Sequence, residues 1–200
     1  MGIRAVDVVL LAGEGMADRV IEANRRLVEE FGSEIALNKE SCLPHISLAM
    51  GCVDKKDMAS VEKILQSIAN KSHPGDLTVS GIRVTGSGSE AVSAFVVERT
   101  EELQLLHEEV MGKLSPYLGG DVTADMLYGD EEAGERTLEW IRDYRQKSSF
   151  ANFWPHITIG GGEIEDRSLP AKFAASELAL CHLGNHCTCR KILVSIKLKT

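Results

Sequence analysis

The sequence contains two copies of one short pattern, LPHISLAMG at residues 43–51 and WPHITIGGG at residues 154–162. Proline, histidine, isoleucine and a closing glycine coincide, and a serine in one copy stands against a threonine in the other. A histidine two positions before a hydroxyl residue also arises by chance, and His186 with Thr188 is a third match without the surrounding pattern. The shared surroundings make the first two copies specific, and they predict a duplicated structural unit.

Each copy has the alternation of a half-buried β-strand. Successive side chains on a strand point to opposite faces, so His45 and Ser47 share one face while Ile46 points into a core. His156 and Thr158 repeat this arrangement. The imidazole and the hydroxyl of each copy therefore lie roughly 6–7 Å apart along the strand. If the two copies face one another, two histidines and two hydroxyls converge on one small space.

Two histidines and two hydroxyls suit the cleavage of a phosphodiester. The reaction needs a base for the attacking oxygen and an acid for the leaving oxygen, and imidazole serves as either near neutral pH. Hydroxyl groups can donate hydrogen bonds to the nonbridging phosphate oxygens and stabilise the charge that develops there. This chemistry requires no metal and no cofactor.

The paired motifs resemble those of the 2H phosphoesterase superfamily, in particular its 2′-5′ RNA ligase-like and cyclic phosphodiesterase members. The resemblance covers most of the chain, because a strand, motif, helix, two strands, helix, second motif and two terminal strands follow that family's order. It implies an α+β, bilobal fold with pseudo-twofold antiparallel sheets, outer helices and a central groove. It also implies a role in RNA processing, in which 2′,3′-cyclic phosphates are opened to 2′-phosphates or 2′-5′ linkages are made and broken.

By this resemblance the catalytic residues are His45, Ser47, His156 and Thr158, and both hydroxyls also bind substrate. Family precedent favours His156 as the base toward water and His45 as the acid, while the symmetry of the motifs leaves that assignment open. Ser47 departs from the commoner threonine but keeps the hydroxyl. The alternative is a protein of the same fold that binds RNA ends or nucleotides without turnover.

Apolar periodicity predicts the remaining elements of one domain over residues 1–200. We expect an insertion at 121–149, with a helix at about 135–146 and an acidic cluster at 130–132. Thr100 is expected to cap a helix, and the glycine- and serine-rich stretch 86–89 to turn a hairpin. Strands are predicted at 6–11, 43–49, 77–84, 91–98, 153–159, 173–181 and 191–199, and further helices at 16–31 and about 58–68.

The composition limits the class of protein and its partners. The 200 residues carry a formal charge of −8, which argues against binding of long nucleic acid but permits a small anionic ligand held by a few local donors. The sequence contains no run of about 20 apolar residues, so we expect no membrane span, and we expect no signal peptide. The odd count of five cysteines favours a reducing compartment. We expect a cytoplasmic monomer whose partner is a small nucleotide or RNA end.

Two further clusters leave alternatives open. Residues 181–189 contain five side chains that could bind zinc, yet their spacing equally fits a hairpin turn with reduced thiols. The segment around 140–147 interleaves cations with aromatic rings, which fits phosphate and base binding or a solvated helix face. His73 and His107 are interpreted as ordinary loop and helix residues.

Overall fold

The computed structural model describes residues 2–129 and 133–198 and is an α+β fold. The described chain contains seven strands and four α-helices, with short 3₁₀ turns in several of the connections. The strands are β1 (Ile3–Ala12), β2 (His45–Asp54), β3 (Asp76–Thr85), β4 (Val92–Val97), β5 (His156–Gly161), β6 (Ala171–Leu183) and β7 (Cys189–Lys197), and the helices are α1 (Glu14–Phe31), α2 (Met58–Ala69), α3 (Glu101–Leu114) and α4 (Glu135–Lys147).

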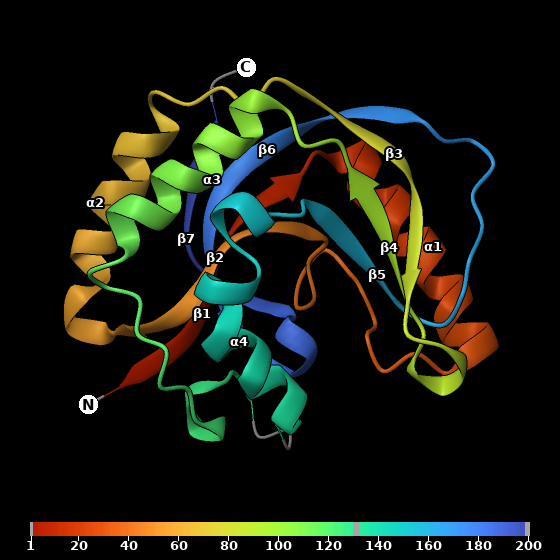
Figure 1. Ribbon diagram of the computed structural model, residues 1–200, viewed down its shortest axis with the longest axis horizontal. Coiled ribbons are helices and arrows are strands. Elements are labelled where there is room, and N and C mark those ends of the chain that lie inside the picture. The colour runs from red at the N-terminus through yellow and green to blue at the C-terminus, as the bar shows by residue number, and fades with distance from the viewer. Residues whose placement is uncertain (1, 130–132, 199–200) are drawn as a thin grey trace.

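All strand pairs are antiparallel, and β6 belongs to both halves of the sheet. Its first residues pair with β3, and its remaining residues pair with β1 on one side and β7 on the other. The first half is therefore β2-β1-β6-β7, and the second half is β6-β3-β4-β5. Figure 1 shows β6 as a long arch that links the two halves.

The helices bury one face of each half. In β1, Val6, Val8 and Leu10 are fully buried, and the apolar faces of α2 and α3 complete this core with residues such as Leu65 and Leu103. Helix α1 contacts β5 and covers the second half, on the opposite side of the molecule from α2 and α3 (Figure 1). The polar faces of the motif strands are left to point away from these helices.

Each motif strand carries a β-bulge directly after its hydroxyl residue. In the first half, Ser47 pairs with Val9 and Ala49 pairs with Val8, so that Leu48 is the extra residue. In the second half, Ile159 is extra between the pairs of Thr158 with Ala94 and of Gly160 with Ser93. The two motif strands thus share the same irregularity at the same position, as a duplicated unit predicts.

Most predicted elements are confirmed. β3 and β4 form the hairpin, and the Thr100 hydroxyl accepts a hydrogen bond from the Leu103 amide at the start of α3. Within the expected insertion, α4 lies where a helix is predicted, whereas the acidic cluster at 130–132 falls outside the described residues. The division into one domain with an insertion stays a prediction. In the described part of the chain, no helix is both long and apolar enough to cross a membrane.

Candidate active site

The two motif strands stand at opposite ends of the strand order yet contact each other in space. β2 and β5 approach at the centre of the molecule because the shared strand β6 lets the two halves fold toward one another (Figure 1). Along each motif the side chains alternate between half-buried and buried, with His45, Ser47, His156 and Thr158 in the half-buried positions. A charge on His156 disfavours a charge on His45, so the two imidazoles share one electrostatic environment.

Matching hydrogen bonds fix the orientation of both imidazole rings. His45 Nδ1 lies 2.7 Å from the carbonyl oxygen of Leu43, and His156 Nδ1 lies 2.8 Å from that of Trp154. A carbonyl oxygen only accepts hydrogen bonds, so Nδ1 must carry the proton in the neutral ring. The Nε2 atom of each histidine is therefore the nitrogen left for acid–base chemistry.

Burial keeps both imidazoles neutral at neutral pH. Burial is the main cause that lowers the pKa of His45 to about 4, with a smaller contribution from His156. Burial also lowers the pKa of His156. Both Nε2 atoms are thus ready to accept a proton, and neither ring holds a second one by itself.

The bulge of the first motif is held by a buried histidine from α3. His107 is fully buried, and its Nδ1 lies 2.8 Å from the carbonyl oxygen of Leu48, the extra residue of the bulge. Its Nε2 accepts a hydrogen bond of 2.7 Å from the Phe150 amide, and its ring stacks on Phe153. His107, expected to be an ordinary helix residue, thus ties the first motif to the loop that enters the second.

Asn24 of α1 makes the corresponding connection in the second half. Its amide nitrogen donates to the carbonyl oxygens of Ile159, the extra residue of the second bulge, and Ile35, each at 2.7 Å. Its side-chain oxygen accepts from the Leu37 amide at 2.7 Å, in the loop that enters the first motif. Sequence reasoning missed both residues, although a polar residue inside an apolar helical stripe is the signal that marks them.

An aromatic ring and a cation extend the site beside the second motif. The Trp154 ring stacks on His156 with ring centroids 4.3 Å apart and an angle of 18°. The exposed Arg83 guanidinium lies 5.0 Å from the centroid of the Trp154 ring. Through the pairs of Arg83 with Ala94 and of Ala94 with Thr158, Arg83 shares the sheet face of the motif hydroxyl.

A buried carboxyl extends the site beside the first motif. Asp7 lies on β1, is fully buried, and places its Oδ2 atom 3.8 Å from His45 Nε2. Burial raises its pKa well above the usual range, against the opposing effects of the Ser47 hydroxyl and the Ala49 amide. Neither group meets the carboxyl with full hydrogen-bond geometry. In the sequence this residue is an unexplained interruption of an apolar strand.

The aromatic and basic segment of α4 is divided between the site and the surface. Tyr144 is buried, and its hydroxyl donates to the Ser47 carbonyl oxygen at 3.4 Å. Arg145 instead bonds to Ser115, and Lys147 pairs with Asp143 at 2.7 Å. The expected insertion therefore contributes packing against the first motif, while these two cations are engaged elsewhere.

The cysteine- and histidine-rich segment 181–189 comprises the end of β6, the turn that follows it and the first residue of β7. Cys181 and Cys189 are buried, and burial, with a smaller effect of Cys181, raises the pKa of Cys189. His186 contacts Glu34 at 2.9 Å on the surface. Within residues 2–129 and 133–198, no three histidine, cysteine or acidic side chains are arranged to hold a metal ion.

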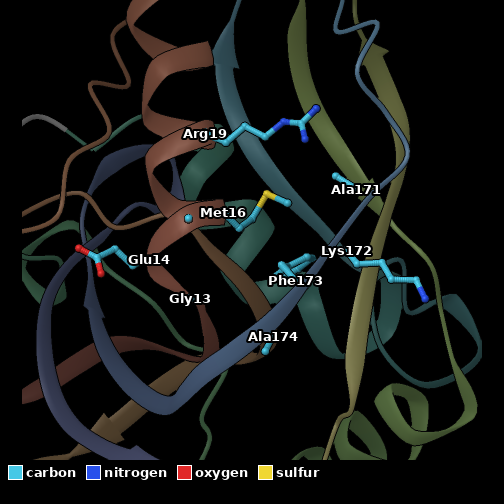
Figure 2. A pocket seen from close by; sticks show the side chains of 9 residues that line it. Gly13, Glu14, Met16, Arg19, Ala171, Lys172, Phe173 and Ala174 are labelled. Atoms are coloured by element: carbon cyan, nitrogen blue, oxygen red, sulfur yellow. The ribbon is translucent and has the colours of Figure 1, made fainter.

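A separate hollow of about 330 Å³ lies where α1 begins, between that helix and the first residues of β6. Figure 2 shows Met16 and Arg19 of α1 facing Lys172 and Phe173 of β6 across it. Arg19 is held by Asp166 at 2.7 Å. None of the four motif side chains lines this hollow, so it is not part of the candidate active site.

Several solved structures have a similar fold. The protein TT0787 of Thermus thermophilus is similar over 97% of each chain, with a TM-score of 0.61 and 16% sequence identity. E. coli LigT complexed with phosphate is similar over the whole of both chains, with a TM-score of 0.51 and 12% identity, and its complex with 3′-AMP gives 0.50 and 13%. These likenesses concern the fold.

No curated protein sequence matches the chain significantly. The family model described as the 2′-5′ RNA ligase superfamily matches residues 18–183, which include both motifs and all of the expected insertion. The antiparallel α+β architecture and the family match agree with each other. The chain therefore belongs to the 2′-5′ RNA ligase superfamily, whose fold is that of the 2H phosphoesterases.

Proposed function

We propose that this protein is a phosphodiesterase that opens 2′,3′-cyclic phosphates of nucleotides or RNA ends to 2′-phosphates, without a metal or another cofactor. The observation that carries the proposal is the matched pair of imidazoles. Each has its Nδ1 bound to a carbonyl oxygen and its Nε2 unengaged by a hydrogen bond in the described structure, on two strands that contact each other. Two such nitrogens supply both proton transfers that the reaction needs.

In the reaction, water attacks phosphorus, and His156 Nε2 accepts a proton from it as the new P–O bond forms. The bond between phosphorus and the 3′ oxygen breaks, and His45 Nε2 delivers a proton to that oxygen. The product has a 2′-phosphate and a free 3′-hydroxyl. Family precedent for the order of the motifs favours this assignment.

Ser47 and Thr158 are proposed to donate hydrogen bonds to the nonbridging phosphate oxygens, because each shares its strand face with a histidine. The exposed Arg83 cation, which lies over the Trp154 ring beside the second motif, suits an anionic ligand. The 3′-AMP complex of the similarly folded LigT supports a small nucleotide as ligand. The net charge of −8 favours short substrates over long RNA. A monomer acting in the cytoplasm is part of the proposal.

The test is to incubate the purified chain with 2′,3′-cyclic nucleotides and short RNAs ending in a cyclic phosphate, with and without EDTA. We expect a 2′-phosphomonoester whose rate is unaffected by the chelator. Tight binding of nucleotides without any product would instead favour the binding protein of the same fold. Formation of a 3′-phosphate would contradict the direction of ring opening that we propose.

A further inference from the structure

The proposed reaction requires a proton on His45 Nε2 that the ring does not hold by itself. Burial lowers the pKa of His45 to about 4, so at neutral pH the isolated imidazole is almost entirely the neutral form. A general acid works best when its pKa lies near the operating pH. Another group must therefore keep a proton within reach of this nitrogen.

Asp7 is an acidic side chain beside that nitrogen. Its Oδ2 atom lies 3.8 Å from His45 Nε2, about 1 Å beyond a hydrogen bond. It sits on the inner strand β1, paired with β2 on one side and β6 on the other, and water does not reach it. Both of its carboxyl oxygens lack a full hydrogen-bond partner among the described residues.

The fold itself does not require a carboxyl at this position. Asp7 pairs with Met50, three residues after the hydroxyl residue of the first motif. The equivalent position of the second half pairs with Gly161, three residues after Thr158, and is occupied by Val92. The same backbone site thus carries an apolar side chain in one half and a buried acid in the other.

Burial favours the protonated form of Asp7, against the opposing effects of the Ser47 hydroxyl and the Ala49 amide, and the neighbouring titratable groups leave His45 as its proton acceptor. Burial raises the pKa of Tyr144 on α4, of Cys187 in the turn after β6 and of Cys189 on β7, and Asp7 acts on all three in the same direction. These groups are neutral at neutral pH. From β2 the carboxyl meets His45, the Ser47 hydroxyl and the Ala49 amide, and across the site His45 faces His156.

We propose that Asp7 is a positioning residue that stores the proton delivered by His45, an inference that rests on the proposed function. When an anionic phosphate binds, the O–H bond of the Asp7 carboxyl breaks and an N–H bond forms at His45 Nε2. That N–H bond then breaks as the 3′ oxygen leaves with the proton. After product release a proton from solvent reaches the buried Asp7 carboxylate through the partly exposed His45, and His156 returns to solvent the proton taken from water.

The first test compares pH–rate profiles of the wild type, Asp7→Asn and Val92→Asn on a 2′,3′-cyclic nucleotide. Asparagine keeps the shape of the aspartate but stores no proton, so the alkaline limb of kcat should move toward acid by at least about one pH unit. At pH values above the alkaline limbs of both proteins, kcat of the variant should be about tenfold or more below that of the wild type. The loss should shrink toward acidic pH. Val92→Asn is the matched control at the equivalent position of the second half and should keep the wild-type alkaline limb.

A second measurement does not depend on turnover. In protein labelled at the histidine rings, NMR should show His45 gaining a proton when inorganic phosphate binds to the wild type near neutral pH, and not in Asp7→Asn. If Asp7→Asn does not fold, Asp7→Val carries the test, because valine is the residue of the other half.

The outcomes separate the two proposals. A wild type without turnover overturns the proposed function, and NMR then decides the role of Asp7 alone. An active wild type whose alkaline limb is unchanged by Asp7→Asn overturns the proton store while the phosphodiesterase stands. The proton store is equally overturned if His45 titrates identically in both proteins with and without phosphate.

Discussion

The two halves of the molecule have the same backbone around their motifs and opposite surroundings. Each presents a histidine and a hydroxyl on a strand with a bulge in the same place. His45 lies against a buried carboxyl and near the helix α4, whereas His156 stacks on an indole beside an exposed arginine. The duplicated scaffold thus supplies two imidazoles in the same backbone setting, and their neighbours give them different electrostatic surroundings.

The supports behind the motifs differ in the same way. Both bulge carbonyls accept from a buried side chain of a helix, Leu48 from His107 and Ile159 from Asn24. Each support also reaches the loop that leads into the opposite motif. The two motifs are therefore connected by two sets of hydrogen bonds. Protonation of His107 can break one set, whereas Asn24 does not titrate.

The largest expected effect comes from removing either imidazole. His45→Ala and His156→Ala should each lower kcat by about 10²–10⁴-fold, because each removes one of the two proton transfers. The double variant should be little worse than either single one, since the two groups act as a unit. Rates are measured on a cyclic-phosphate nucleotide, with circular dichroism to verify the fold. Near-normal turnover in either single variant contradicts the assignment.

The next effect concerns the two supports. His107→Ala and Asn24→Ala should each lower the free energy of unfolding by about 2–4 kcal/mol, because both leave buried backbone groups unpaired. The lowered pKa of His107, about 4 against about 6.5 in the unfolded chain, means that its stabilising effect is present above pH 6.5. This contribution is lost as the pH falls toward 4.

Denaturant titrations at several pH values separate the two supports. His45 and His156 add to the acid sensitivity of the wild type, since burial lowers the pKa of both. Asn24→Ala should therefore keep that sensitivity, while His107→Ala should lose part of it. Equal pH dependence in the two variants would mean that the His107 link does not respond to protons.

The smallest effect is a gain in stability. Asp7→Val gives the first half the type of side chain that the second half carries and should raise the free energy of unfolding by about 1–3 kcal/mol, because it removes a buried unpaired carboxyl. The raised pKa of Asp7 favours folding most below about pH 4. That contribution is lost as the pH rises, so the advantage of the variant should grow with pH.

Thermal unfolding at acidic and neutral pH measures the difference in stability between Asp7→Val and the wild type. Val92→Ala serves as a control for altered packing at the equivalent position of the second half. A variant that is less stable than the wild type at all pH values would make Asp7 a structural residue. A gain in stability together with a loss of activity is the pattern of a functional group kept at the cost of stability.

Much of the architecture could be predicted from the sequence because it depends on local patterns. Alternation of apolar and polar residues located the motif strands, and the cap at Thr100 located the start of α3. The repeat of proline, histidine and hydroxyl indicated a duplicated unit before any coordinates. The hairpin turn of residues 86–89 could be predicted as well, since glycine and serine favour tight turns.

The sequence alone determined the two motifs, the sides of the strands on which they lie and the order of helices and strands, because each of these follows from neighbours within a few residues. Only the tertiary structure decided what surrounds each histidine. Asp7 is 38 positions from His45 in the chain, and His107 and Asn24 serve motifs far from their own helices. Burial and contacts between distant residues set the protonation of Asp7, His45 and His107, and no local stretch of sequence specifies either of them.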